Sequence, residues 1–399
     1  MSCPDCGTAP TNHLLAKLDV VIDEGIERLQ RRFGWLERLS EPFMYWVGNN
    51  IVPKIFRVAA SLGIGKIMTT PDETIEPRAR CLWDEANRRG IKMSAYQLVQ
   101  KGARVYMATH NNANITFDMV PRPGNRDSSS VFWMDNKHTM RKEFGSRGIP
   151  VAKGGVVRTQ KEALRLFQTL TPPVIAKPIR GSRSRHTTTH IESASELHRA
   201  VEVAKVVSPW VVIEEELVGL VHRGTVIGGK VIGVLRREPA SVVGDGVHTV
   251  MQLIEKINAD PRRDGKIFHK IEIHDPEHDK ELAHQHLSLK SVPEQGQLVV
   301  LSQKASRGLG GGATDVTDEA HPDNIALLEK IGEVLNDPLV GVDFIIGDVT
   351  RSWKEQARCG IIECNSAPFI DLHLYPLTGK PRDTAGALWD LVFPTSRRM

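Results

Sequence analysis

Two apolar segments near the end of the chain, Val342-Asp343-Phe344 and Ile361-Ile362-Glu363-Cys364-Asn365, decide which fold the sequence predicts. Their β-branched and aromatic residues indicate two strands, each with an oxygen-bearing side chain near its edge. A buried carboxylate is costly unless it is paired or binds a metal, and carboxylate and amide oxygens suit a hard ion such as Mg²⁺. The segments therefore predict a magnesium site at Asp343, Glu363 and Asn365, which would hold a nucleoside triphosphate. Ordinary carboxylates at strand ends are the alternative explanation.

The composition is that of a globular protein of two or three domains. Of its 399 residues, 40% are hydrophobic and 25% are charged, which is ordinary for such chains. The formal net charge of +4 comes from 52 basic and 48 acidic residues. Because this balance does not indicate a nucleic-acid or membrane partner, we expect an enzyme that acts on small molecules.

Nothing in the sequence indicates secretion or a disulfide framework. No run of about eighteen apolar residues is present, and the start, Met1-Ser2-Cys3-Pro4, lacks the pattern of a secretory signal, so we expect a cytoplasmic protein. The five cysteines, at positions 3, 6, 81, 359 and 364, indicate reduced thiols. Cys3 and Cys6 form a lone C-x-x-C pair, for which a zinc ion shared between subunits is the alternative to a terminal thiol pair.

The first 70 residues are expected to be helical. Apolar residues recur at helical spacing over residues 13–40, and the segment 43–62 is more apolar and aromatic. We expect 43–62 to pack on the main body or in a homo-oligomer, most simply a dimer.

The rest of the chain alternates between strand and helix patterns. Residues 71–131 predict a small α/β unit. The charged stretch 260–294 contains five histidines and predicts a solvated excursion, with a second metal site as the alternative. The individual elements expected are helices over 78–89, 140–147, 194–206 and 249–258, and strands at 105–107, 115–117, 174–177, 210–214 and 225–235.

Two further patterns suit a nucleotide. Lys137 and Lys177 are compact charges suited to phosphate oxygens, and Lys177 precedes a loop of small and basic residues, 180–185, whose amides could approach the same group. The strand and turn 211–219 place Glu214, Glu215 and Leu217 where a backbone hinge could pair with an adenine edge. Three glutamates on a solvated turn would give a similar pattern.

In this order the patterns resemble those of the ATP-grasp ligases, and several motifs are similar to the ATP-grasp part of the cyanophycin synthetase family. The resemblance covers about 132–394 and is specific, because unrelated motifs recur in the family's order. The motifs are Arg237-Glu238-Pro239-Ala240, Val243-Gly244-Asp245-Gly246-Val247-His248-Thr249-Val250, Asn258-Ala259-Asp260-Pro261-Arg262, Gly311-Gly312-Ala313-Thr314-Asp315-Val316-Thr317-Asp318, His321-Pro322-Asp323-Asn324 and Arg351-Ser352-Trp353.

The resemblance implies an α+β ATP-grasp fold and an ATP-dependent carboxylate–amine ligase that works through an acyl phosphate. Its two subdomains would span 132–212 and 213–394, the second with the charged insertion near 260–294. A helical segment, 1–70, and a small α/β domain, 71–131, would precede them. The alternative is a nucleotide-binding regulatory or partner protein without turnover.

The resemblance also assigns roles to individual residues. For the nucleotide, it implies phosphate contacts for Lys137, Lys177, Gly181 and Ser182, and adenine contacts for Glu214, Glu215 and Leu217. The implied Mg²⁺ ligands are Asp343, Glu363 and Asn365. It also implies a place near the acyl phosphate for Arg223 and Arg237, and substrate contacts for Phe369, Asp371 and His373.

Several positions depart from the family pattern. Val221 replaces an acid that could hold the ribose, and the loop residues Arg183 and Arg185 replace glycines. Phe369 and Asp371 stand where the family has glycine and arginine, so we expect a narrower pocket and a small or basic amine acceptor. In the alternative, Asp371 pairs with Arg382 or another nearby cation. The chain ends about where the family continues into a Mur-ligase domain, so we do not expect it to make the branched polymer alone.

Overall fold

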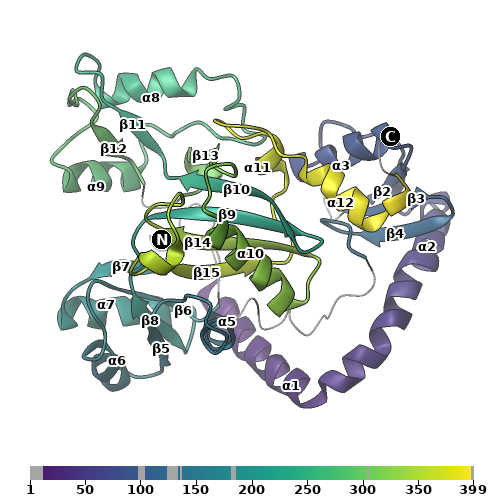
Figure 1. Cartoon of the computed structure of the whole chain (residues 1–399), viewed down its shortest axis with the longest axis horizontal. Helices are drawn as coiled ribbons and strands as arrows, with labels where there is room; N and C mark the ends of the chain where they lie inside the picture. The colour runs from purple at the N-terminus through teal and green to yellow at the C-terminus, as the bar shows by residue number, and fades with distance from the viewer. Residues whose placement is uncertain are drawn as a thin grey trace.

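The computed structural model describes residues 12–97, 104–123, 134, 137–180, 186–302 and 305–396, without the side chains of 26–42, 44 and 104. Within these residues the strands form four sheets, one of which is central to the molecule (Figure 1). The other three lie around it, and each of them packs against at least one helix. The mixed, largely antiparallel architecture agrees with the α+β fold expected from the sequence.

The central sheet has five antiparallel strands in the order β13-β10-β9-β14-β15. Helix α10, Pro322–Leu335, covers one face, where Gly224 allows a close approach because a Cβ there would lie 2.5 Å from Leu328 Cδ1. The other face is covered at one end by helix α12, Thr384–Val392. The five strands are β9 Leu220–Ile227, β10 Lys230–Glu238, β13 Gly312–Asp315, β14 Leu339–Ile346 and β15 Gly360–Asn365.

A four-stranded sheet, ordered β5-β8-β6-β7, lies beside the central one (Figure 1). Helices α6, Gln160–Phe167, and α7, Ala194–Lys205, each begin with a capping box, in which a Ser or Thr side chain and a Glu side chain satisfy exposed backbone amides. The elements of this unit are α5 Lys137–Gly145, β5 Gly154–Val157, α6 Gln160–Phe167, β6 Val174–Pro178, β7 Thr188–Ile191, α7 Ala194–Lys205 and β8 Val211–Glu215.

The small N-terminal sheet, ordered β1-β2-β3-β4, shares its core with the end of the chain. Helix α3, Pro77–Arg88, packs against α12, and the fully buried Trp389 donates its indole N–H to the Leu82 carbonyl at 2.9 Å. The small sheet and the C-terminal helix are therefore parts of one hydrophobic cluster. The strands are β1 Lys66–Met68, β2 Lys92–Gln97, β3 Arg104–His110 and β4 Ala113–Phe117.

The charged stretch 260–294 is not the solvated excursion expected from its composition. With its neighbours it forms a compact unit around buried apolar residues such as Val242, Ile271, Leu282 and Val299. Many of the charges lie at exposed positions between these inward-facing residues, whereas Arg263 and Glu281 are buried, so composition alone gave the wrong prediction. The unit contains β11 Ser241–Val243, α8 Val250–Asn258, α9 Pro276–His284 and β12 Leu298–Val300.

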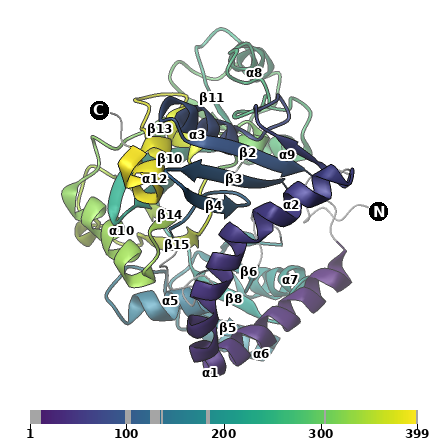
Figure 2. The same cartoon turned by 90° about the vertical axis from the view of Figure 1, so that its right-hand side faces the viewer.

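The N-terminal helices connect the four-stranded sheet with the small one. Near its start, α1, His13–Asn50, packs Val20 against Ile179 and Val212, and at its end Asn49 Oδ1 accepts from the Thr116 N–H at 2.6 Å (Figure 2). The chain continues through α2, Val52–Ser61, so both expected helical segments are present, with the first one longer than predicted. No helix in the described ranges has the length and hydrophobicity needed to cross a membrane.

The shared core predicts that the small sheet depends on the C-terminal helix. Trp389→Ala should lower the free energy of unfolding by about 3–5 kcal/mol, because it removes a buried ring and its hydrogen bond. Hydrogen exchange should then rise in β2 and β3 as well as in α12. Leu164→Ala, at an exposed position on α6, is the control and should change neither. Faster exchange in α12 alone would contradict a common core.

Candidate active site

One face of the central sheet carries the predicted metal ligands. Asp343 on β14 lies directly opposite Arg223 on β9 and Glu363 on β15. Two residues from Asp343 along β14, Gly341 pairs with Asn365. Opposite residues in a sheet point to the same side, as do residues two apart along a strand. Asp343, Glu363 and Asn365 are thus on the same face, while α10 covers the other.

A β-bulge sets this geometry on β15. Glu363 pairs with Asp343 and Ile361 pairs with Phe344, so Ile362 is an extra residue in the strand. Because of it, Ile361 packs in the core under α10 while Glu363 faces the opposite side. Without the bulge, residues 361 and 363 would point the same way.

Asp343 is a buried carboxylate held by two arginines. Arg223 donates from Nη2 to Oδ2 at 2.7 Å and from Nε to Oδ1, and Arg237 Nη1 lies 3.7 Å from Oδ2. Burial would raise the pKa of Asp343, but the charge and hydrogen bonds of Arg223, with the charge of Arg237, outweigh it and lower the pKa. Burial likewise opposes the charge of Arg223, yet Asp343 raises its pKa overall, so both groups stay ionised.

The pKa of Arg237 is lowered, whereas that of Arg223 is raised. Burial lowers the pKa of Arg237, and Asp343 only partly offsets this because Arg223 and Arg307 also lie near. Its Nη2 donates to the Ala305 carbonyl. The Arg223 and Arg237 side chains predicted to act together are therefore next to each other in the structure.

The residues present fit a magnesium ion in their chemistry. Glu363 and Asn365 are half-buried and supply hard oxygen atoms. In Asn365 the atom that could bind a metal is Oδ1, because Nδ2 is a hydrogen-bond donor. Nδ2 is buried and finds no acceptor within the described residues. Asp343 could join them only by sharing its oxygens with Arg223. No group of three or more His, Cys, Asp or Glu in the described chain is placed to hold a metal. The site on β14 and β15 therefore offers two carboxylates and an amide, and the histidines of 260–294 form no such group.

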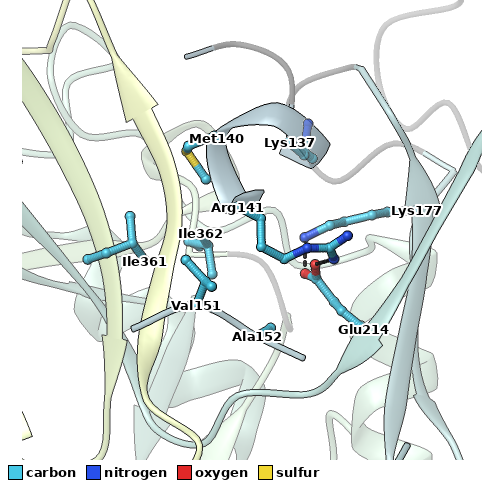
Figure 3. Close-up of a pocket in the computed structure, with 9 residues that line it drawn as sticks. All are labelled: Lys137, Met140, Arg141, Val151, Ala152, Lys177, Glu214, Ile361 and Ile362. Atoms are coloured by element: carbon cyan, nitrogen blue, oxygen red, sulfur yellow. Dashed lines mark hydrogen bonds and ion pairs between the residues drawn. The ribbon is translucent and has the colours of Figure 1, made fainter. Parts of the chain in front are cut away.

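A pocket lies between the four-stranded sheet and the start of β15 (Figure 3). Cationic side chains lie on one side of it, and the bulge residue Ile362 lies on the other. Its lining residues are Lys137, Met140, Arg141, Val151, Ala152, Lys177, Glu214, Ile361 and Ile362.

Two cations converge on Glu214 in this pocket. Lys177 pairs with Oε1, and Arg141 Nη1 donates to Oε2 at 3.2 Å (Figure 3). Burial lowers the pKa of Arg141, and the Glu214 charge opposes this shift. Sequence reasoning missed Arg141, although it follows Lys137 by four residues, a spacing that places both side chains on one helix face.

Two backbone amides of the strand and turn 211–219, which were expected to pair with an adenine edge, have partners within the protein. The Glu215 and Glu216 N–H groups donate to the carbonyls of Lys153 at 2.8 Å and Pro173 at 3.0 Å, so these two amides do not face a ligand. Glu215 also accepts from the Thr171 N–H at 2.9 Å, while Leu217 is half-buried after the strand. Gly181, Ser182, Arg183 and Arg185 lie outside the residues that the structure describes.

Asp371 is not an open acid in a substrate pocket. It is fully buried, and its Oδ2 accepts from Arg307 Nη1 at 2.7 Å. The alternative explanation was a pair with Arg382 or another nearby cation, and that cation is Arg307, since Arg382 donates to Asp315 at 2.6 Å. Because Arg307 compensates its charge, Asp371 gives no reason to expect a basic acceptor, and that part of the sequence prediction loses its basis.

His373 and Phe369 have different surroundings. His373 is fully buried, its Nε2 lies 2.8 Å from Thr225 Oγ1, and burial followed by the charge of Arg223 lowers its pKa to about 3, so it is neutral. Its contact with Thr225 joins the segment after β15 to β9 of the central sheet. Phe369, by contrast, is 44% exposed.

Comparisons with known proteins agree with this architecture. No family model matches the sequence. The chain is 32% identical over 336 residues to cyanophycin synthetase from Trichormus variabilis, which covers 82% of this chain and 36% of that protein. It is 28% identical over 335 residues to the glutathione biosynthesis bifunctional protein GshAB from Clostridium perfringens, covering 80% of this chain and 41% of that protein.

A solved structure gives the same result. A bifunctional glutathione synthetase from Pasteurella multocida superposes with a TM-score of 0.63 at 25% identity, over 81% of this chain and 44% of that one. The chain spans less than half the length of each of these proteins. With two sheets meeting at a pocket that Lys137 and Lys177 line, and with Asp343 opposite Glu363 on neighbouring strands of the central sheet, the chain has the ATP-grasp fold and is homologous to the ATP-grasp region of cyanophycin synthetase.

Proposed function

We propose that the chain is an ATP-dependent carboxylate–amine ligase that releases ADP and phosphate. The observation that carries the proposal is the row Arg223, Asp343 and Glu363, with Asn365 beside it, on the sheet face reached by β15 from the Lys177 pocket. The related proteins named above support the same class of reaction.

The proposed reaction has two steps. A carboxylate oxygen attacks the γ-phosphorus of ATP, the bond to the β-phosphate oxygen breaks, and ADP leaves. The amine then attacks the acyl carbon, phosphate leaves, and the nitrogen loses a proton as the amide forms. Both steps concentrate negative charge on phosphate oxygens, so catalysis depends chiefly on positioning and on compensating charge.

The chain's own residues would supply that compensation. Lys137 and Lys177 would contact the phosphates at the pocket, and Arg223 and Arg237 would lie near the acyl phosphate. Asp343 fixes Arg223 through two hydrogen bonds, so that arginine is oriented before any substrate binds. Magnesium held by Glu363 and Asn365, with Asp343 beside them, would add Lewis-acid charge neutralisation at the transferring phosphate.

Turnover on a substrate panel tests the reaction class. Purified protein with ATP and Mg²⁺ should release ADP only when a suitable carboxylate and amine are both present, and mass spectrometry should find one new amide. The panel should include amino acids, short peptides and simple amines. ATP binding without ADP release on every combination would instead favour a nucleotide-binding regulatory protein.

Substitution of the proposed metal ligand Glu363 should reduce activity without reducing stability. Glu363→Gln should reduce kcat by at least about a hundredfold, because losing a metal ligand costs several kcal/mol of transition-state stabilisation. The thermal unfolding temperature of the variant should remain near that of the wild type. Glu355→Gln, whose side chain is 64% exposed, is the matched control and should keep full activity.

Asp343 should behave differently from Glu363 in the same experiment. Asp343→Asn removes the charge that compensates the buried Arg223, which costs about 3–5 kcal/mol of stability in such pairs. Unchanged ADP formation in Glu363→Gln would rule out the metal assignment.

We further propose a homodimer formed through the apolar surface of residues 43–62. Phe43 is 63% exposed, Trp46 is 52% exposed and Leu62 is 70% exposed. So many exposed large apolar side chains on two consecutive helices are typical of an interaction surface. Light scattering should give twice the 44.3 kDa monomer mass, and Trp46→Glu should shift the distribution toward monomer. A monomer mass at all concentrations would refute the dimer.

A further inference from the structure

Three parts of the chain meet at Phe369. The Arg307 Cζ atom lies 4.5 Å from the centroid of its ring, and the Arg78 Cζ atom lies 5.0 Å from it. Arg307 belongs to the segment that follows the α8–α9 unit, whereas Arg78 belongs to α3 of the small N-terminal unit. Guanidinium groups at these distances are attracted by an aromatic ring, and more strongly where water is excluded.

Arg78 also binds the backbone of the segment that carries Phe369. It is only 7% exposed, and its Nη1 donates to the Ala367 carbonyl at 2.8 Å. The nearest carboxylate, on Glu76, is 3.9 Å away and 75% exposed, so it is a weak competitor. A buried arginine from a separate unit therefore fixes the segment directly after the Asn365 metal ligand, through one hydrogen bond and one ring contact.

Arg307 is held in place from the other side. Asp371 accepts its hydrogen bond, and Ala305, two residues earlier, accepts from Arg237. The segment 366–371 is thus bound both to α3 and to the chain around Arg237. Helices α3 and α11, Asp371–Leu374, lie next to each other and on the far side of the central sheet from β5–β8 (Figure 1).

The course of β15 shows which substrate this segment faces. The strand starts at the nucleotide pocket with Ile361 and Ile362, continues through Glu363 and Asn365, and then enters the segment. At about 3.3 Å per residue, Asn365 lies about 10 Å beyond Ile362. The segment 366–371 therefore lies past the predicted metal ligands, where the group receiving the phosphate and its amine partner must approach, and not beside the adenine.

We propose that Arg78 is a positioning residue for the non-nucleotide substrates, acting through Ala367 and Phe369. The small N-terminal unit is then part of the active site, because it supplies the group that sets the shape of the acceptor end. This inference rests on the proposed ligase function. It assigns Arg78 no direct role in the chemistry, so its effect should differ between the substrates.

Steady-state kinetics of four variants test the proposal. Arg78→Ala should raise the KM for the carboxylate or the amine about tenfold, the equivalent of one charge-assisted hydrogen bond, while the KM for ATP stays within about twofold of the wild type. Arg78→Lys keeps the charge but not the planar stacking, so it should recover part of the loss. Phe369→Leu should have a similar effect on the same KM. Because both residues act on one segment, the double variant Arg78→Ala/Phe369→Leu should be less impaired than the product of the single effects.

The matched control is Arg80→Ala, two residues along α3. Arg80 is half-exposed and pairs with Asp84 one turn away, so its removal should alter neither KM. If Arg78→Ala and Arg80→Ala lower thermal stability equally and leave every KM unchanged, Arg78 is merely structural and the proposal is wrong. An equal rise in the KM for ATP would also overturn it.

A second measurement separates this proposal from the ligase assignment. If the wild type turns over no substrate pair, the proposed function fails, but hydrogen exchange still reports on the segment. Arg78→Ala should then increase exchange in 366–371 above the level seen in Arg80→Ala. Unchanged exchange in that segment would overturn the positioning role whatever the enzyme's reaction.

Discussion

The ion pair between Arg223 and Asp343 is the constraint on which the rest of the structure depends. The two residues are 120 positions apart in sequence, buried, and joined by two hydrogen bonds across neighbouring strands. A charge left alone in such a place is strongly unfavourable, so β9 and β14 must pair in this register and in no other. The whole chain between them, including the α8–α9 unit and α10, has to fold as an excursion from this pairing. The pair thus links the architecture of the sheet to the charge balance of the site.

The same face of the sheet serves two purposes along its length. At one end Ile227 and Leu339 pack under α12 in an apolar cluster, and a few residues farther along the same strands Arg223 and Asp343 form the polar end. The apolar cluster continues into the small N-terminal sheet through Leu82 and Trp389. Burial at one end therefore holds the charged row rigid at the other, at the cost of making three distant parts of the chain depend on each other.

Much of the fold and site could be predicted from the sequence because local patterns carry them. One apolar strand contains Asp343, another contains Glu363 and Asn365, and a third has Lys177 near its end, and each of these patterns is visible in a few consecutive residues. Long-range pairing is not visible in this way: Arg223 neutralises Asp343, Arg307 neutralises Asp371, and Arg141 joins Lys177 on Glu214. The expectation for 260–294 failed for a related reason, since the average charge of a stretch does not show that its few apolar residues face a common interior.

The bulge at Ile362 also bears on how this chain can change over evolutionary time. Regular pairing of all five residues from Ile361 to Asn365, with Ile362 opposite Asp343, would turn the rest of the strand over and point Glu363 into the packed layer beneath α10. Deletion of Ile362 would remove the bulge and leave Glu363 opposite Asp343, on the face that it now occupies. Surface connections such as 347–359 carry no such restriction, because a change in their length leaves the strand register intact. Length variation among descendants of this chain is therefore expected in its connections and at the bulge residue Ile362, whereas the paired residues from Glu363 to Asn365 can vary in identity but not in number.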